Sequence, residues 1–317
     1  MTKKSFFFSI ITAVLAGLLI SFGVIKSMAI ISTIGASEDE GEDSTFIYHF
    51  SRVFKYSTVD SVGAIGELLE NKDNQPTQTG SGDISALSYI VLNVDRDTVL
   101  LEKSAEQLLP LASITKIVTA VIAKRLLIAD DQIAITSKIL SIEGDTGRLR
   151  LGEKMKVVEL LYPLLMVSSN DSAYALSSYY DSIYGKGEFV KAMNDWVSSV
   201  GAYRTYFKDS SGLSPSNLST AKDISIIAKW IRKNEPSIFD ITMTKTKSIR
   251  THTWVNPTHF LNLSAYEGGK NGYTPEANRT SVSLFSIDSP KRLYIVVLLG
   301  SKQRDEDTLA VLNKVLR

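Results

Sequence analysis

Residues 111–118 read LASITKIV, a stretch that places the hydroxyl of Ser113 three positions before the ammonium of Lys116. In a helix, side chains three positions apart lie on one face and can touch. Pro110 is expected to open this helix, because a proline lacks only an N–H that the first turn does not use. The neighbours of the pair are mostly apolar, which predicts a helix that is buried on most sides.

The pair of Ser113 and Lys116 admits two interpretations. In the first, burial lowers the pKa of Lys116, so that the neutral amine is a general base beside a serine nucleophile. In the second, Ser113 caps the helix and Lys116 extends along the apolar surface to water. The stretch alone favours the second interpretation, so the choice depends on partners elsewhere in the chain.

The composition of the chain excludes several classes of function. Of 317 residues, 44% are hydrophobic and 22% are charged, and the formal net charge of +1 argues against nucleic acid as a partner. The absence of cysteine excludes disulfides, thiolate catalysis and cysteine-based zinc sites. His49, His252 and His259 have no metal-ligand spacing, and the sequence has no phosphate-binding glycine loop. We therefore expect neither a metal site nor a cofactor.

The N-terminus predicts a membrane anchor. After a cytoplasmic tail over residues 1–5, residues 6–25 carry no charge and would form a helix about 30 Å long, enough to span the bilayer. The apolar region of a cleaved signal peptide is shorter, and Ile34-Gly35-Ala36 is a poor cleavage site, so cleavage is the less favoured alternative. Lysines before the span and an acidic run over residues 38–43 after it predict a single-pass membrane protein whose remaining residues lie outside the cytoplasm.

Residues 26–84 are interpreted as an extracytoplasmic linker and pre-domain segment, with no role assigned to residues 44–74. Beyond them, β-prone runs over 89–94 and 99–102 flank a turn, which predicts a hairpin. The patterns further along predict helices over 157–166, 173–180, 220–232 and 308–316, and strands over 280–287 and 293–299. This order indicates an α+β fold in which helices pack on an antiparallel sheet.

Two further segments offer partners for Ser113. Residues 166–176 (MVSSNDSAYAL) place Ser168 and Asn170 on a polar turn between apolar helices, although such residues are also ordinary helix caps. Residues 266–276 (YEGGKNGYTPE) alternate Lys270 and Gly272 on an expected edge strand, where glycine permits close approach by a ligand. Alone, that segment is equally an ordinary glycine-rich turn with a surface lysine.

A second Ser-x-x-Lys stretch, from Ser219 to Lys222, opens an amphipathic helix and has no polar partner motif near it. We assign it to helix capping, with Thr220 and Asp223 at the start of the helix. The spacing of Ser113 and Lys116 is therefore not diagnostic without its partners.

Taken together, the three segments are similar to the motif set S-x-x-K, S-D-N and K-T-G. From about Ser85 onward the chain resembles the low-molecular-mass penicillin-binding proteins, which are serine-type D-alanyl-D-alanine carboxypeptidases of the β-lactamase-like superfamily. The stretches that carry the resemblance in order, spacing and context are 109–116, 151–153, 160–171, 211–213, 221–223, 254–256 and 269–274.

The resemblance implies a fold and a domain arrangement. Residues 85–317 would form the catalytic domain, with a penicillin-binding/β-lactamase-like transpeptidase fold. In that fold an antiparallel sheet is flanked by helices and joined to a helical subdomain. The additional C-terminal β-domain of the family is not expected, because the chain ends soon after the last predicted strand.

The resemblance also implies a catalytic mechanism. Ser113 would attack the carbonyl between two D-alanines and form an acyl-enzyme, while Lys116 takes its proton with help from the nearby charge of Lys270. Ser168 would pass a proton to the departing D-alanine amine. The N–H groups of Ser113 and Tyr273 would form the oxyanion hole.

The remaining implied residues bind the substrate. Asn170 would orient its backbone amide, and Lys270 would attract its terminal carboxylate. The peptide would add to the edge strand, where Gly272 leaves room for it, with Asn271 and Thr274 completing the substrate site.

The implied substrate is a peptidoglycan stem peptide that ends in D-Ala-D-Ala, and β-lactam antibiotics would be covalent inhibitors. One departure concerns the position of Asn271, where the family usually has Thr or Ser, whose hydroxyl helps to hold the substrate carboxylate. An asparagine amide can also donate, but it is larger and differently shaped. Ser169 stands where glycine is common, which is a milder change.

Three alternatives remain at this point. A DD-endopeptidase or a β-lactamase of the same superfamily would use the same motifs, but no glutamate lies between Phe189 and Asn234, where a class A β-lactamase would carry its deacylating residue. A degenerate domain that binds cell-wall peptide without turnover is supported by Asn271 alone. The complete set of implied catalytic residues argues against it.

Overall fold

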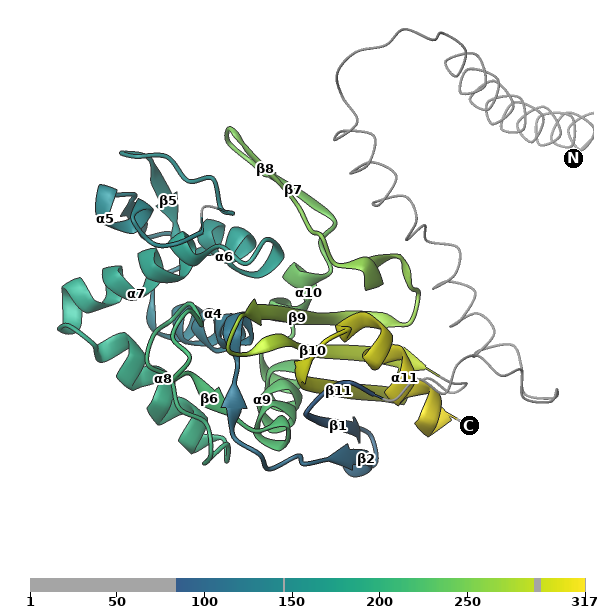
Figure 1. The fold of residues 1–317 in the computed structure, drawn as a ribbon. Coiled ribbons are helices and arrows are strands. Elements are labelled where there is room, and N and C mark those ends of the chain that lie inside the picture. Colours follow the sequence, from purple (N-terminus) through teal and green to yellow (C-terminus); the bar gives the residue numbers. More distant parts are fainter. Residues whose placement is uncertain (1–83, 145, 288–291, 317) are drawn as a thin grey trace, which may run out of the picture. The chain divides into compact units, whose positions relative to one another are not determined.

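A computed structural model describes residues 84–144, 146–287 and 292–316 (Figure 1). They belong to the second of two compact units of the chain, residues 58–317. Within the described residues, no helix combines the length and the apolar character needed to cross a membrane. The anchor predicted over 6–25 lies outside these ranges and stays a prediction, as does most of the 26–84 segment.

The centre of the fold is a five-stranded antiparallel sheet with the strand order β2-β1-β11-β10-β9. Its strands are β1 (Ser88–Asn93), β2 (Thr98–Lys103), β9 (Tyr266–Thr274), β10 (Asn278–Ile287) and β11 (Arg292–Ser301). The predicted hairpin, the two late strands and the edge position of the strand that carries Lys270 are all confirmed.

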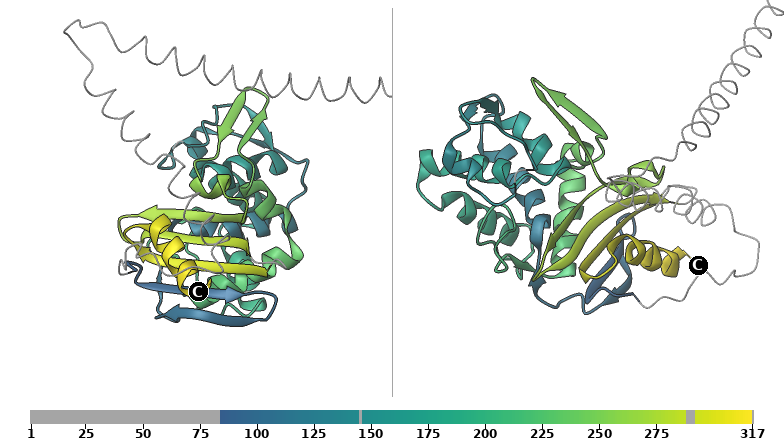
Figure 2. Two further views of the ribbon diagram at one scale, coloured as in Figure 1. Left: turned by 90° about the vertical axis from the view of Figure 1, so that its right-hand side faces the viewer. Right: turned by 45° about the horizontal axis from the view of Figure 1, so that its top comes forward.

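The sheet separates two hydrophobic cores, because successive side chains of a strand point to opposite faces. On β11, Val297 belongs to the main core, whereas its neighbour Val296 belongs to a smaller core on the other face. Helix α11 (Arg304–Leu316) covers the smaller core and contributes Val311 and Leu312 to it (Figure 2). The other long helices lie on the opposite side, where they form the main core with the sheet (Figure 2).

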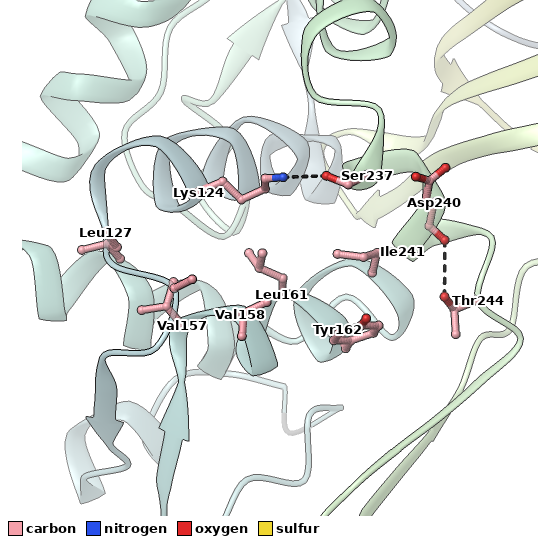
Figure 3. Close-up of a pocket in the computed structure, with 11 residues that line it drawn as sticks. Lys124, Leu127, Val157, Val158, Leu161, Tyr162, Ser237, Asp240, Ile241 and Thr244 are labelled. Atoms are coloured by element: carbon pink, nitrogen blue, oxygen red, sulfur yellow. Dashed lines mark hydrogen bonds between the residues drawn. The ribbon is translucent and has the colours of Figure 1, made fainter.

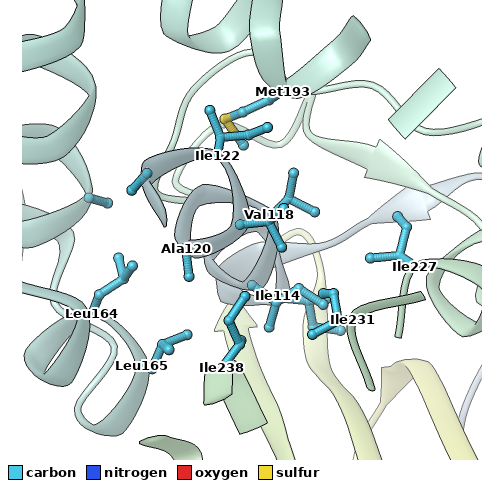
Figure 4. Close-up of a cluster of buried hydrophobic side chains, with 14 of the residues drawn as sticks. Ile114, Val118, Ala120, Ile122, Leu164, Leu165, Met193, Ile227, Ile231 and Ile238 are labelled. Carbon is cyan, nitrogen blue, oxygen red and sulfur yellow. The ribbon is translucent and has the colours of Figure 1, made fainter. Parts of the chain in front are cut away.

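Helix α4 lies at the centre of the main core. Nine of its twelve residues are buried, from Thr115 to Ala123, which confirms the helix predicted to be buried on most sides. Figure 4 shows its apolar side chains surrounded by those of the neighbouring helices. The helices of this part are α4 (Thr115–Leu126), α5 (Ser137–Leu140), α6 (Val157–Met166), α7 (Asn170–Tyr184), α8 (Glu188–Ser199), α9 (Ala221–Asn234) and α10 (Ser237–Thr242).

Short elements connect this framework. They are the two-stranded pairs β3 (Leu109–Pro110) with β6 (Leu218–Ser219), β4 (Gln132–Ala134) with β5 (Lys154–Lys156), and β7 (Thr246–Ile249) with β8 (His252–Val255), and the 3₁₀ turns η1 (Ala112–Ile114) and η2 (His259–Asn262). The expectation that Pro110 opens a helix is wrong. Pro110 pairs with Leu218 in a strand, and the chain passes through η1 before α4 begins.

The helix starts agree with the capping chemistry of the sequence. α7 begins three residues earlier than predicted, because the Ser169 hydroxyl accepts a hydrogen bond from the Ser172 N–H at 3.0 Å. At α9, the Thr220 hydroxyl accepts from the Asp223 N–H at 3.0 Å. The Lys222 ammonium binds Glu106 at an exposed site, so the second Ser-x-x-Lys stretch is structural, as predicted.

Candidate active site

Ser113 lies in the tight turn η1, directly before α4. The preceding residue, Ala112, has φ = +49°, a left-handed conformation that costs a residue other than glycine on the order of 1–3 kcal/mol. Lys116 Nζ donates a hydrogen bond to Ser113 Oγ at 2.9 Å. Neither η1 nor α4 has a side-chain cap, so the interpretation of Ser113 as a helix cap is wrong.

Lys116 is fully buried, with 0% of its surface exposed, so it does not extend to water. Its Nζ has two further acceptors, Asn170 Oδ1 at 2.7 Å and the Ser211 carbonyl at 2.5 Å. Burial holds the pKa of Lys116 well below its ordinary value, and the positive charge of Lys270 lowers it further, whereas the charge of Asp209 acts in the opposite direction. These are the conditions under which a lysine becomes a neutral base.

Lys270 forms the second serine–lysine pair of the site. Its Nζ donates to Ser168 Oγ at 3.0 Å and to the Asn271 carbonyl at 2.7 Å. Burial, with a contribution from the charge of Arg304, lowers the pKa of Lys270 to about 7. Ser168 has φ = +61° in the short connection between α6 and α7, so a second strained residue lies at this site.

Strand β9 lies directly against the turn that carries Ser113. A Cβ atom added at Gly272 would lie 2.8 Å from the Ser113 nitrogen and 2.5 Å from Thr280 Oγ1, so only glycine fits. Thr280 Oγ1 also donates to the Leu111 carbonyl at 2.8 Å, which ties the neighbouring strand β10 to the same turn. These contacts fix the position of the edge strand relative to the Ser113 turn.

The other residues predicted on β9 have different environments. The Tyr273 side chain is 62% exposed, and its ring stacks with Arg279 at 5.8 Å. Thr274 Oγ1 accepts from the Ala277 N–H at 3.1 Å and so belongs to the following turn. The half-buried Asn271 side chain makes no hydrogen bond to any residue in the described ranges. The structure therefore brings together Ser113, Lys116, Ser168, Asn170, Lys270 and Gly272, and leaves the Tyr273 and Thr274 side chains outside this network.

Sequence reasoning missed the residue that organises the loop behind Ser113. Asp209 accepts three hydrogen bonds from backbone N–H groups, each at 2.7 Å, and this loop supplies the Ser211 carbonyl that binds Lys116. Gly212 has φ = +89° and packs so closely that a Cβ would lie 2.0 Å from the Ala112 carbonyl oxygen. The signal in the sequence was the turn-forming run Asp-Ser-Ser-Gly over residues 209–212.

A second missed contact supports Asn170. Its Nδ2 donates to the Glu143 carbonyl at 2.7 Å. The loop that begins there is fastened to β8, because Trp254 Nε1 donates to the Gly147 carbonyl at 2.8 Å and the buried His252 ring binds Glu153 at 2.8 Å. His252 thus has a carboxylate partner that holds it in the structure.

A pocket of about 430 Å³ lies elsewhere, between α4, α6 and α10 (Figure 3). Its lining is mostly apolar, with Leu127, Val158 and Leu161 among the side chains drawn, and its rim includes Lys124 bonded to Ser237 at 2.5 Å. None of the predicted site residues lines it. On α4, Lys124 follows Lys116 by eight positions, a separation of about 12 Å along the helix axis at 1.5 Å per residue.

The fold and the site define a class of protein. One serine is hydrogen-bonded to a buried lysine, and a second serine is hydrogen-bonded to a lysine on the adjacent edge strand. This is the arrangement of serine acyl-transfer enzymes of the penicillin-binding type. The family model for D-alanyl-D-alanine carboxypeptidase, Peptidase S11, matches residues 72–302. The chain belongs to this family, and it is a serine-type hydrolase of the cell wall.

Curated relatives carry carboxypeptidase and endopeptidase names. The chain is 29% identical to a D-alanyl-D-alanine carboxypeptidase of Streptomyces sp. strain K15 over 80% of this chain and 92% of that protein. It is 29% identical to a D-alanyl-D-alanine endopeptidase of Pseudomonas aeruginosa over 69% of this chain and 73% of that protein.

Solved structures agree with the α+β fold of penicillin-binding proteins. The structure of a D-alanyl-D-alanine carboxypeptidase from Mycobacterium tuberculosis H37Rv has a TM-score of 0.67 at 25% identity, over 76% of this chain and 95% of that chain. A mutant of the Streptomyces K15 DD-transpeptidase has a TM-score of 0.67 at 26% identity, over 76% of this chain and 99% of that chain.

Proposed function

We propose that this chain removes the terminal D-alanine from peptidoglycan stem peptides through an acyl-enzyme on Ser113. The observation that carries the proposal is the 2.9 Å contact between Lys116 Nζ and Ser113 Oγ in a fully buried environment. Ser113 Oγ attacks the carbonyl carbon of the D-Ala-D-Ala bond, and Lys116 accepts the hydroxyl proton.

The hydrogen-bond partners of Lys116 match those that a neutral amine can satisfy, which supports Lys116 as the base. A neutral lysine amine has two N–H donors and one lone pair. The Asn170 oxygen and the Ser211 carbonyl can each accept one of the two donors, at 2.7 and 2.5 Å. The remaining lone pair then faces the Ser113 hydroxyl, which donates to it and is activated for attack.

The leaving group receives its proton through Ser168. When the tetrahedral intermediate collapses, the C–N bond breaks, and the proton passes from Lys116 through the Ser168 hydroxyl to the departing D-alanine amine. Lys270 holds Ser168 at 3.0 Å and presents a positive charge to the carboxylate of the leaving D-alanine. In the second half-reaction, water attacks the ester while Lys116 accepts its proton, and Ser113 is restored.

Substrate binding is proposed to follow strand addition at β9. As the edge strand of the sheet, β9 offers backbone groups to an extended peptide. Gly272 lets this strand lie directly against the Ser113 turn. The N–H groups of Ser113 and Tyr273 would hold the carbonyl oxygen as its negative charge develops. Asn170 already binds Lys116 and the Glu143 carbonyl, so its contact with substrate would use the second lone pair of Oδ1.

A DD-endopeptidase is the second candidate, because several relatives at 29–34% identity carry that name. Both reactions cleave after the same D-alanine and use the same acyl-enzyme. The two candidates differ in the leaving group, which is free D-alanine for a carboxypeptidase and a cross-linked peptide for an endopeptidase.

The proposed location is the outer face of the cell membrane. The uncharged run over residues 6–25 and the charges on either side of it support a single-pass anchor. Such an anchor would hold the catalytic domain near the peptidoglycan, where β-lactam antibiotics would acylate Ser113.

The test is mass spectrometry of the detergent-solubilised full chain after incubation with benzylpenicillin and, separately, with a peptide that ends in D-Ala-D-Ala. We expect a penicilloyl adduct on Ser113 and released D-alanine, both lost in Ser113→Ala. Ser219→Ala is the matched control, because Ser219 begins the other Ser-x-x-Lys stretch. A folded chain that forms no adduct would exclude the mechanism, and cleavage of cross-linked dimer without release of D-alanine would favour the endopeptidase.

A further inference from the structure

We propose that Asp209 is a positioning residue of this reaction: it fixes the carbonyl group that binds the Lys116 amine, and its charge sets the pH range in which Lys116 acts as a base. The inference rests on the proposed role of Lys116. It assigns a function to a residue outside the three sequence motifs.

The first support is the hydrogen bonding of the Asp209 carboxylate. Oδ1 accepts from the N–H groups of Ser211 and Gly212, and Oδ2 accepts from the N–H of Ser214, each at 2.7 Å. Oδ1 also accepts from the Ser211 hydroxyl at 2.9 Å. Charge-assisted bonds of this kind are stronger than neutral ones, so the carboxylate determines the conformation of the loop.

The second support is what the loop contacts. The Ser211 carbonyl accepts from Lys116 Nζ at 2.5 Å, and the Ser210 carbonyl accepts from Thr119 Oγ1 at 2.6 Å, one turn further along α4. Gly212 packs against the carbonyl of the strained residue Ala112. The loop thus holds the base and also supports the backbone immediately before the nucleophile.

The third support is the charge balance around Lys116. Among the described residues, the charge of Lys270, from β9, lowers the pKa of Lys116, and the charge of Asp209, from this loop, raises it. From α7 the contacting group is the neutral amide of Asn170, followed in the sequence by the buried Asp171. Removing the negative charge of Asp209 leaves burial and the charge of Lys270 unopposed, so the pKa of Lys116 falls further.

A matched control exists within the same domain. Asp223 also holds a loop through its carboxylate, since Oδ2 accepts from the Arg204 N–H at 2.7 Å and from Thr205 Oγ1 at 2.9 Å. Asp223 is not among the described groups whose charge shifts the pKa of Lys116. Asp223→Asn therefore reproduces the structural part of the change without the electrostatic part.

The experiment measures the second-order rate of acylation by benzylpenicillin against pH, with the full chain in detergent, for the natural chain, Asp209→Asn and Asp223→Asn. The acidic limb is the part of the pH–rate profile where the acylation rate rises as Lys116 loses its proton. In Asp209→Asn we expect this limb to move to lower pH by about one unit and the plateau of the acylation rate to fall roughly tenfold. Asp223→Asn is expected to leave the acidic limb in place.

Asp209→Glu keeps the charge and displaces the carboxylate. It should lower the plateau and leave the acidic limb near its natural position, which keeps the test decisive if Asp209→Asn does not fold. An unmoved acidic limb in Asp209→Asn, or a moved one in Asp209→Glu, would overturn the role of Asp209 alone. Failure of the natural chain to form an adduct on Ser113 would overturn the proposed function as well.

Discussion

At the scale of single residues, the proposed mechanism gives two buried lysines opposite tasks. Lys116 must be neutral to accept a proton, whereas Lys270 must be charged to attract a carboxylate. Burial lowers the pKa of both, and the charge of Lys270 adds to the lowering for Lys116. Each lysine therefore limits activity on a different side of the pH optimum.

We predict a bell-shaped dependence of kcat/KM on pH. Below its pKa Lys116 is protonated and inactive, which gives the acidic limb. Above pH about 7 Lys270 loses its charge, which gives the alkaline limb. In kcat the alkaline limb should lie at higher pH, because the bound carboxylate stabilises the charged form of Lys270. Steady-state kinetics of D-alanine release against pH measures both limbs.

Lys270→Arg identifies the group behind the alkaline limb. A guanidinium stays charged throughout this range, so the limb near pH 7 should disappear while the rate falls because the shape of the group differs. An alkaline limb that persists at the same pH in Lys270→Arg would assign it to another group.

A second prediction concerns Asn271. Its side chain makes no hydrogen bond to the residues that the structure describes, so its amide can bind substrate. Replacing Asn271 with Ala removes a donor to the substrate carboxylate. We expect KM to rise roughly fivefold to twentyfold with little change in kcat, corresponding to about 1–2 kcal/mol of uniform binding. Asn271→Thr supplies a hydroxyl and should keep KM near or below that of the natural chain. An unchanged KM in Asn271→Ala would show that this side chain does not contact the carboxylate.

Helical spacing shows that Ser113 and Lys116 can touch. The stretch alone favours a capping serine and a lysine that extends to water, so the resemblance was needed to predict the pair. The second pair, Ser168 with Lys270, was implied by resemblance, since no local rule joins residues 102 positions apart. The contact of Lys116 with Ser211 spans 95 positions, and Ser211 is followed by a left-handed glycine at 212. Sequence patterns alone therefore do not place Asp209 near Lys116.

At the scale of elements, the proposed position of the substrate depends on the close contact of β9 with η1. In Gly272→Ala the new methyl group would overlap the Ser113 nitrogen and the Thr280 hydroxyl, so either the strand or the turn must move. A displacement of about 1 Å at a reacting group can cost a hundredfold in rate. We expect acylation by benzylpenicillin to slow by roughly that factor and the free energy of unfolding to fall by about 1–3 kcal/mol.

Gly152→Ala is the control for this substitution. Gly152 has φ = +82° and no atom within 4 Å of an added Cβ, so the change strains the backbone without touching the site. It should lower stability by about 1 kcal/mol and leave the acylation rate unchanged. If Gly272→Ala acylates as fast as Gly152→Ala, the strand and the turn are not in rigid contact.

Element types followed from the sequence more readily than element starts. The bounds of α6 agree with the predicted 157–166 because its apolar pattern is continuous. The start of α4 differed, since the pairing of Pro110 with Leu218 and the left-handed Ala112 are long-range features. Tertiary packing, and not local preference, decided where that helix begins.

At the scale of the whole molecule, the two ends of the described chain meet in one sheet. β1 pairs with β11, and the Ser85 hydroxyl donates to the buried carboxylate of Asp307 on α11 at 2.7 Å. A sheet closed by strands about 200 positions apart cannot be read from local periodicity, although its antiparallel character and edge strand were predicted. From this closure we predict that the residues from 84 onward are sufficient for a folded catalytic unit.

The last prediction tests that boundary together with the membrane anchor. A shortened chain of residues 84–317 should stay in the soluble fraction and be acylated by benzylpenicillin at the rate of the detergent-solubilised full chain, because Ser85 and β1 are retained. The full chain should sediment with membranes and require detergent for release. A second shortened chain that begins at residue 72, where the family match begins, locates any further contribution. If only the longer version folds, residues 72–83 belong to the domain. If the full chain is released by salt alone, the uncharged run over 6–25 is not a membrane span.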